Sequence, residues 1–189
     1  IAAINIKTIQ IADSVNMAHI AILGLGNWGT AVARMWLLEG HKVKGWTIEQ
    51  EVYESVVMDG INKKYLPNHS VEGLEATMRL DEALDGVEIV VLAIPSSVIL
   101  DVVDEVIPHL RPGHVLIDLA KGLAPGKRLI SQAIHEKLNA AKKSNPLAVV
   151  TGPTIAPEAA GGVITTALVA SEDESIAKRL AETLTTQTF

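Results

Sequence analysis

Short apolar runs alternate with helix-like segments along nearly the whole chain, and this alternation limits the folds available to it. Runs rich in β-branched residues predict strands over 19–23, 42–48, 77–80, 87–94, 114–120, 147–151 and 163–170. Apolar spacing predicts helices over 30–39, 49–58, 96–110 and 129–142, with Leu129 on a buried face, and a last helix capped by Ser171 with Glu174 three residues later. The alternation predicts an α/β fold, a doubly wound and mostly parallel sheet with right-handed crossovers.

Composition excludes several classes of protein. Of the 189 residues, 48% are apolar and 3% aromatic, which predicts a globular protein with an aliphatic core. A net charge of −6 offers no basic stripe for a nucleic-acid backbone, so we expect no nucleic-acid partner. No uncharged run reaches the roughly 18 residues that a membrane span needs. The absence of Cys fits the reducing cytoplasm, and the histidines lack metal-ligand spacing, so we expect a soluble cytoplasmic protein without metal.

The two ends of the chain differ from its body. Residues 1–16 precede Met17 and are interpreted as an N-terminal extension or a tag remnant, whereas 17–189 are expected to form one domain. The last residues, 185–189, favour β-structure, which predicts a domain truncated at its C-terminal end inside a strand. Such a truncation would leave apolar residues near Phe189 exposed. We therefore expect association or poor solubility of the chain, and a homodimer is one assembly that this allows.

The sharpest local motif is Gly24-x-Gly26-x-x-Gly29, which follows the first predicted strand and opens the first predicted helix. In this setting the first glycine permits a tight turn, and the second lets the backbone approach a pyrophosphate. The third lets helix and strand pack closely. A glycine turn that binds nothing is the alternative. The strand-turn-helix context favours a dinucleotide-binding fingerprint over a chance match.

The residue that follows the second predicted strand bears on the choice of coenzyme. An acidic residue about 20 positions after the glycines accepts hydrogen bonds from the ribose 2′-hydroxyl of NAD. Glu49 stands there, and no arginine lies near it in the sequence to bind the 2′-phosphate of NADP. The pattern therefore favours NAD. The alternative is that Glu49 only stabilises the start of helix 49–58 through the helix dipole.

Two further segments follow predicted strands at the edge where open α/β sheets bind ligands. Lys121 comes after strand 114–120, and its ammonium group can hold a phosphate or polarise a carbonyl group. Thr151 to Thr154 come after the next strand and offer backbone N–H groups and a hydroxyl. A solvated surface lysine and an ordinary turn are the alternatives. Trp28, inside the glycine turn, is expected to pack against the base of the helix rather than to lie along the coenzyme.

Five segments in this order resemble the NAD(P)-dependent glycerol-3-phosphate dehydrogenases, in their N-terminal dinucleotide-binding domain. The resemblance consists of a glycine turn with an aromatic residue, a Tyr-Leu-Pro loop, a Pro-Ser turn, a Lys-Gly motif and a Gly-Pro-x-x-Ala-x-Glu segment. These motifs lie at 24–31, 62–67, 93–96, 121–123 and 152–158. The chain departs from the family at Ile155, where an aromatic residue is usual, and at Thr154, where Ser or Asn is usual.

The resemblance implies roles for individual residues. Lys121 is the candidate catalytic residue of this chain, and it also contacts coenzyme and substrate. Together with the glycine motif, the resemblance assigns coenzyme binding to Gly24, Gly26, Asn27, Trp28, Gly29, Glu49, Tyr65, Pro95, Lys121 and Ala156, and substrate binding to Lys121, Gly152 and Thr154.

The activity that the resemblance implies is the reversible oxidation of sn-glycerol 3-phosphate to dihydroxyacetone phosphate with NAD or NADP, in glycerophospholipid synthesis. In the family, an all-helical C-terminal domain supplies the general-base lysine. That domain is absent from this chain, so we expect the chain to bind coenzyme and to be inactive alone. Two alternatives stay open: a dehydrogenase of another small phosphate or acid, and a non-catalytic NAD(H)-sensing module.

Overall fold

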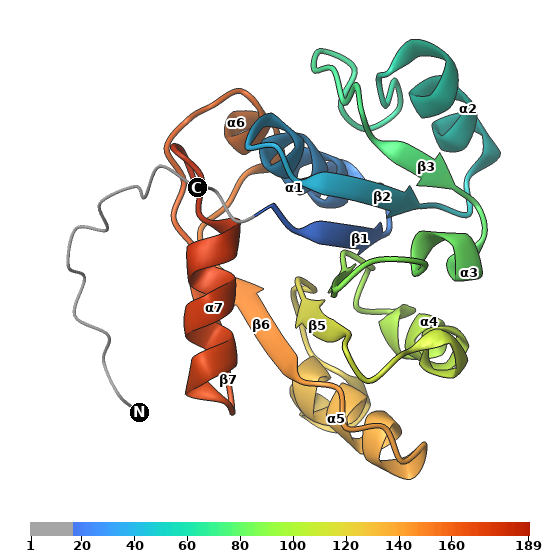
Figure 1. Cartoon of the computed structure of the whole chain (residues 1–189), viewed down its shortest axis with the longest axis vertical. Coiled ribbons are helices and arrows are strands. Elements are labelled where there is room, and N and C mark those ends of the chain that lie inside the picture. Colours follow the sequence, from blue (N-terminus) through green and yellow to red (C-terminus); the bar gives the residue numbers. More distant parts are fainter. Residues whose placement is uncertain (1–16) are drawn as a thin grey trace.

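The computed structural model describes residues 17–189, and the predicted extension 1–16 lies outside the described residues. These residues build a 7-stranded sheet in the order β3-β2-β1-β4-β5-β6-β7 (Figure 1). Neighbouring strands are parallel, except that β7 is antiparallel to β6. The doubly wound, mostly parallel α/β fold is therefore confirmed. The strands are β1 (His19–Leu23), β2 (Lys42–Trp46), β3 (Glu75–Thr77), β4 (Ile89–Leu92), β5 (Val115–Asp118), β6 (Leu147–Thr151) and β7 (Leu168–Ser171).

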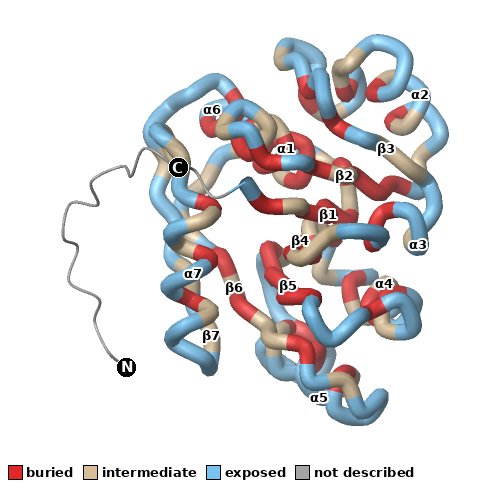
Figure 2. The backbone as a smooth tube through the Cα atoms, viewed as in Figure 1, coloured by how far each residue is buried: buried red, intermediate tan, exposed pale blue. Residues whose placement is uncertain are grey.

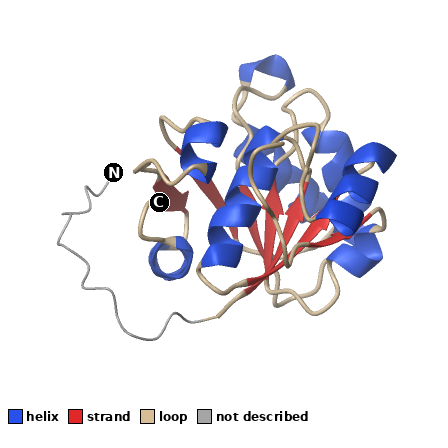
Figure 3. Cartoon of the chain, turned by 90° about the horizontal axis from the view of Figure 1, so that it is seen from above, coloured by secondary structure: helices blue, strands red, loops and turns tan. Residues whose placement is uncertain are grey.

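Helices lie on both sides of this sheet (Figure 3). One apolar cluster joins the sheet to α1, α2, α6 and α7, and a second joins its other face to α3, α4 and α5. None of the described helices is long and apolar enough to cross a membrane. The helices are α1 (Asn27–Leu38), α2 (Gln50–Asp59), α3 (Leu80–Ala83), α4 (Ile99–Val106), α5 (Ile130–Ala140), α6 (Ala156–Ala160) and α7 (Glu174–Leu184), with 3-10 turns at Ile107–His109 and Pro125–Lys127.

The centre of the sheet carries the core and fixes where a ligand can bind. Every residue of β4 and β5 is buried, and Figure 2 shows this for β5 by its red colour. Burial on both faces explains why these strands read as continuous apolar runs. From β1 the chain builds outward to β2 and β3, returns to β4 beside β1, and then builds the other way. Ligands of open α/β sheets bind beyond the carboxyl ends of the strands at such a reversal.

The region between β6 and α7 differs from the predicted strand over 163–170. Only Leu168–Ser171 pairs with β6. Residues before this strand form other backbone hydrogen bonds: the N–H of Val163 donates to the Glu158 carbonyl, and the N–H of Thr165 donates to the Thr188 carbonyl. The short helix α6 is not predicted, since five residues that include Pro157 show no readable periodicity.

Helix starts also differ from the predictions, and α4 begins at Ile99 instead of at residue 96. The cap of α7 is Asp173, whose carboxylate accepts from the Ser175 N–H at 2.9 Å, while the Ser171 hydroxyl donates to the Leu147 carbonyl. Leu129 is exposed, because it precedes α5 in extended backbone and so lies off the buried face of the helix. Helix α1 begins at Asn27 instead of at residue 30, because Gly26 already serves as its N-cap.

The last residues do not form the predicted strand. Residues 185–189 turn instead, and the Thr186 hydroxyl oxygen accepts from the N–H groups of Thr188 at 3.1 Å and Phe189 at 2.8 Å. The Phe189 ring stands edge-on to Trp28 with the ring centroids 6.1 Å apart. The expectation of exposed apolar residues here is therefore wrong for Phe189, which is partly buried against the core.

Candidate functional site

The turn between β1 and α1 is shaped by its glycines. Gly24 has a φ of +102°, in the left-handed region that side chains rarely adopt. Its N–H donates to the carbonyl of Trp46 at 2.9 Å, which ties the turn to the end of β2. Gly26 has extended backbone, with a φ of −73°, and precedes the first residue of α1. The helix therefore starts directly beyond the carboxyl end of β1.

The three glycines leave different amounts of space for a side chain. A Cβ atom on Gly29 would overlap the carbonyl oxygen of Gly24, and one on Gly24 would lie 2.5 Å from the carbonyl oxygen of Ala93. A Cβ atom on Gly26 would meet no described atom within 4 Å. Gly24 and Gly29 thus permit close packing of strand and helix, whereas the backbone at Gly26 faces open space.

The start of α1 favours a negatively charged ligand in that space. The first N–H groups of a helix have no partner within the helix, and the helix dipole adds partial positive charge there. No acidic side chain stands in the first turn of α1 to compete for these groups. A phosphate group is the ligand that such a turn stabilises.

Asn62, in the loop after α2, stabilises the glycine turn by hydrogen bonds from its side chain, a contact called the Asn62 brace below. Its side-chain amide donates to the Leu25 carbonyl and to the Thr30 hydroxyl, both at 2.8 Å, and its amide oxygen accepts from the Tyr65 N–H at 3.1 Å. Asn62 is fully buried. Sequence reasoning misses this residue, because only the folded chain brings it to the turn; its place before the Tyr-Leu-Pro sequence was the one available hint.

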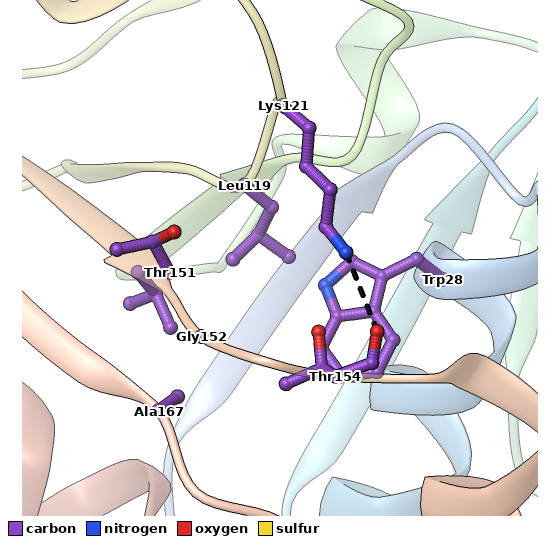
Figure 4. Close-up of a pocket in the computed structure, with 8 residues that line it drawn as sticks. Trp28, Leu119, Lys121, Thr151, Gly152, Thr154 and Ala167 are labelled. Atoms are coloured by element: carbon purple, nitrogen blue, oxygen red, sulfur yellow. Dashed lines mark hydrogen bonds between the residues drawn. The ribbon is translucent and has the colours of Figure 1, made fainter.

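Lys121, Trp28 and Thr154 line one pocket beyond the ends of β5 and β6 (Figure 4). The Lys121 ammonium group donates to the backbone carbonyl of Thr154 at 3.3 Å. Gly152 also lines the pocket, and its lack of a side chain has a packing reason: a Cβ atom there would lie 2.5 Å from the Thr166 carbonyl oxygen. The pocket is further lined by Leu119, Val150, Thr151 and Ala167.

Glu49 lies beyond the end of β2, at the N-cap of α2, but its side chain does not cap that helix. One carboxylate oxygen accepts from the Lys64 ammonium group at 2.6 Å, and the other accepts from the Tyr65 hydroxyl at 2.9 Å. The hydrogen bond from Lys64 lowers the pKa of Glu49, and the bond to Glu49 raises the pKa of Lys64 and of Tyr65. Among residues 17–189, each Glu49 oxygen thus accepts one side-chain hydrogen bond, from Lys64 or from Tyr65, and a carboxylate oxygen can accept more than one.

The predicted site residues form two clusters along one edge of the sheet. Glu49 and Tyr65 gather beyond β2, and Lys121 and Thr154 gather beyond β5 and β6, with the glycine turn beyond β1 between them. Asn27 is exposed at the start of α1, Pro95 is exposed after β4, and Ala156 packs with Trp28 in a small apolar cluster. Among residues 17–189, no three acidic or histidine side chains gather where a metal ion could be held.

Asp118, the last residue of β5, is a buried carboxyl group that the sequence reading does not single out. It is 2% exposed, and its carboxylate accepts from the Ala120 N–H at 2.8 Å. Burial raises its pKa to about 6, although the Ala120 hydrogen bond opposes the shift. It lies at the base of the loop that carries Lys121.

The raised pKa of Asp118 predicts a pH-dependent stability. The folded chain keeps the proton up to about pH 6, whereas an unfolded Asp loses it near its ordinary value of 3.8, so stability falls as pH rises between them. Asp118→Asn retains the acceptor and has no charge to bury. The difference in free energy of unfolding should move by about 2–3 kcal/mol in favour of the Asn variant between pH 4 and 7, as two pKa units imply.

Urea unfolding at several pH values measures this difference directly. Burial lowers the pKa of His41 and His114, which gives stability the opposite pH dependence, but both residues are present in each protein and cancel in the comparison. A difference that stays constant from pH 4 to 7 would contradict the assignment.

Comparison with known proteins identifies the family to which this chain belongs. Residues 19–177 match the family model described as the N-terminus of NAD-dependent glycerol-3-phosphate dehydrogenase. The chain belongs to this dehydrogenase family. The match includes the glycine turn, the Glu49 cluster and the Lys121 pocket, so the resemblance stated from the sequence is confirmed.

Bacterial relatives of the dehydrogenase family match over most of this chain. A glycerol-3-phosphate dehydrogenase [NAD(P)+] from Coxiella burnetii is 34% identical over 171 residues, 90% of this chain and 50% of the relative. One from Anaeromyxobacter dehalogenans is 34% identical over 169 residues, 89% of this chain and 51% of the relative. The crystal structure of the Coxiella burnetii enzyme superposes with a TM-score of 0.83 and covers 92% of this chain and 52% of that one. The chain thus spans about half the length of these relatives.

Proposed function

We propose that this chain is the coenzyme-binding half of an enzyme that interconverts sn-glycerol 3-phosphate and dihydroxyacetone phosphate with NAD(H). The observation that supports coenzyme binding is the open space at Gly26, before a first helical turn without acidic residues, and the substrate pair is proposed from the names of the relatives. Such a turn fits a dinucleotide pyrophosphate. We further propose that the enzyme is cytoplasmic and serves glycerophospholipid synthesis.

The predicted site residues beyond the carboxyl ends of the strands are arranged in an order that fits the successive parts of the coenzyme. Backbone N–H groups at Asn27 and Trp28 would receive the pyrophosphate, and Glu49, held by Tyr65, would accept the adenosine ribose hydroxyls. This arrangement supports a preference for NAD over NADP. The other end of the coenzyme would extend toward Pro95, Ala156 and Lys121, within reach of the pocket beyond β5 and β6.

Lys121 is the group that would hold the substrate. The coenzyme supplies the hydride chemistry when bound, and the protein must orient the substrate and manage its charge. An ammonium group at 3.3 Å from the Thr154 carbonyl can bind the phosphate or polarise the carbonyl oxygen of dihydroxyacetone phosphate, with Gly152 and Thr154 beside it. A general base must lie within hydrogen-bond reach of the alcohol proton. We expect it outside residues 1–189, in a second domain.

The direct test is the initial rate of NADH and NADPH oxidation with dihydroxyacetone phosphate. It compares the product of the complete gene with this 189-residue chain. We expect turnover by the complete product only, faster with NADH than with NADPH, and NADH binding by both proteins. Binding without turnover by either protein would favour another dehydrogenase substrate or an NAD(H)-sensing module.

A further inference from the structure

Lys64 contacts the carboxylate that the proposed function assigns to the coenzyme ribose. Its ammonium group lies 2.6 Å from Glu49 and also pairs with Glu51, and it lies 5.5 Å from the centre of the Tyr65 ring. Its side chain keeps 41% of its surface exposed. Lys64 therefore bonds to Glu49 and is still accessible to solvent. If the coenzyme ribose binds at Glu49, a group attached to that ribose lies within reach of the Lys64 ammonium group.

The electrostatic potential around Glu49 depends on Lys64. A carboxylate at the ribose position accepts hydrogen bonds from a 2′-hydroxyl but repels a 2′-phosphate, and a neighbouring cation is what admits the phosphate. Glu49 and Glu51 carry two negative charges, and Lys64 is the cation that the structure pairs with both of them. Without Lys64, a 2′-phosphate would face two uncompensated carboxylates.

We propose that Lys64 sets the coenzyme specificity of the site around Glu49. With Lys64 present, this site accepts a 2′-phosphorylated dinucleotide as well as the unphosphorylated one. This inference rests on the proposed function, since it requires the coenzyme ribose to lie at Glu49. Lys64 neutralises the carboxylate when NADH is bound and turns its ammonium group to the 2′-phosphate when NADPH is bound. Its flexible stem and exposure permit that exchange of partners.

The neighbouring lysine provides a matched control. Lys63 pairs with Asp59 at 2.8 Å, at the end of α2, and its side chain is more exposed than that of Lys64. Lys63→Met removes the same charge one position away without touching the pair formed by Glu49 and Lys64. A merely general effect of net charge would therefore be equal for Lys63→Met and Lys64→Met.

The experiment is calorimetric titration of the 189-residue chain with NADH and with NADPH, for the unaltered chain, Lys64→Met, Lys64→Arg and Lys63→Met. Hydrogen bonds to charged groups correspond to roughly tenfold or more in affinity. Lys64→Met should therefore weaken NADPH binding about tenfold or more and change NADH binding less than about threefold. Lys64→Arg should retain NADPH binding, and Lys63→Met should leave both affinities unchanged.

Each outcome bears on one of the two proposals. Equal losses for both coenzymes in Lys64→Met, or no loss for either, overturn the specificity role of Lys64 while leaving coenzyme binding established. Equal effects of Lys63→Met and Lys64→Met also overturn it, because they indicate a general charge effect. Failure of the unaltered chain to bind either coenzyme contradicts the proposed function itself.

Discussion

Gly26→Ala should strongly weaken coenzyme binding and leave the fold intact. The backbone at Gly26 has a φ of −73°, which alanine adopts without strain, and the new methyl group meets no described atom within 4 Å. That methyl group would occupy the space in which a pyrophosphate has to approach the backbone. We expect NADH affinity to fall at least about 100-fold, equivalent to ~3 kcal/mol. The free energy of unfolding should change by less than about 1 kcal/mol, the scale of a capping change.

Calorimetric titration with NADH and urea unfolding of the same preparation measure the two quantities together. Gly113→Ala is the matched control, because a Cβ atom on Gly113 also meets no described atom within 4 Å, but Gly113 lies before β5, at the opposite end of the strands. NADH binding by Gly26→Ala at the affinity of the unaltered chain would show that the phosphates do not approach this residue.

Gly29→Ala is expected to destabilise the fold itself. A Cβ atom there overlaps the carbonyl oxygen of Gly24 and lies 3.1 Å from the Cβ atom of Ala93. Both neighbours are fixed, because the Gly24 N–H is bonded to Trp46 and Ala93 donates to the end of β1 at Leu23. Relief therefore requires α1 to move away from the sheet. We expect a loss of about 3 kcal/mol or more, the upper range for overpacking.

A loss of that size lowers the melting temperature of a chain this long by roughly 6–12 °C. Thermal unfolding followed by circular dichroism measures it, again beside Gly113→Ala, which should melt within about 2 °C of the unaltered chain because surface substitutions have small effects. Gly29→Ala melting with the unaltered chain would mean that the close contact between α1 and Gly24 does not constrain the fold. The two glycine variants thus separate ligand approach from packing within one motif.

The fold could be predicted from the sequence wherever the pattern of apolar residues is long enough to show a period. The bounds of β1 and β6 agree with the predicted runs, because their apolar residues stand between clear turn residues. Helix α6 has five residues and no visible period. The strand predicted over 163–170 is shorter because hydrogen bonds to distant residues, such as that of Thr165 to Thr188, replace the ladder.

The candidate site was predictable to the extent that it lies in backbone motifs. The glycine turn can be recognised in the sequence, since its conformation depends on residues that are adjacent in the chain. The pair of Glu49 and Lys64 spans 15 positions, and the bond from Asn62 to Leu25 spans 37, so only the packed chain brings these groups together. Asp118 is hidden for a similar reason: nothing in a run of strand residues indicates how deeply its carboxyl group is buried.

The Asn62 brace has a consequence for the thermodynamics of binding. The same short loop holds the glycine turn through Asn62 and presents Lys64 and Tyr65 to Glu49, so the glycine turn and the surroundings of Glu49 are ordered together when the chain folds. Immobilising loops and side chains on association lowers affinity through lost conformational entropy. Here that entropy is lost during folding, and a ligand that bridges the turn and Glu49 meets a preorganised surface.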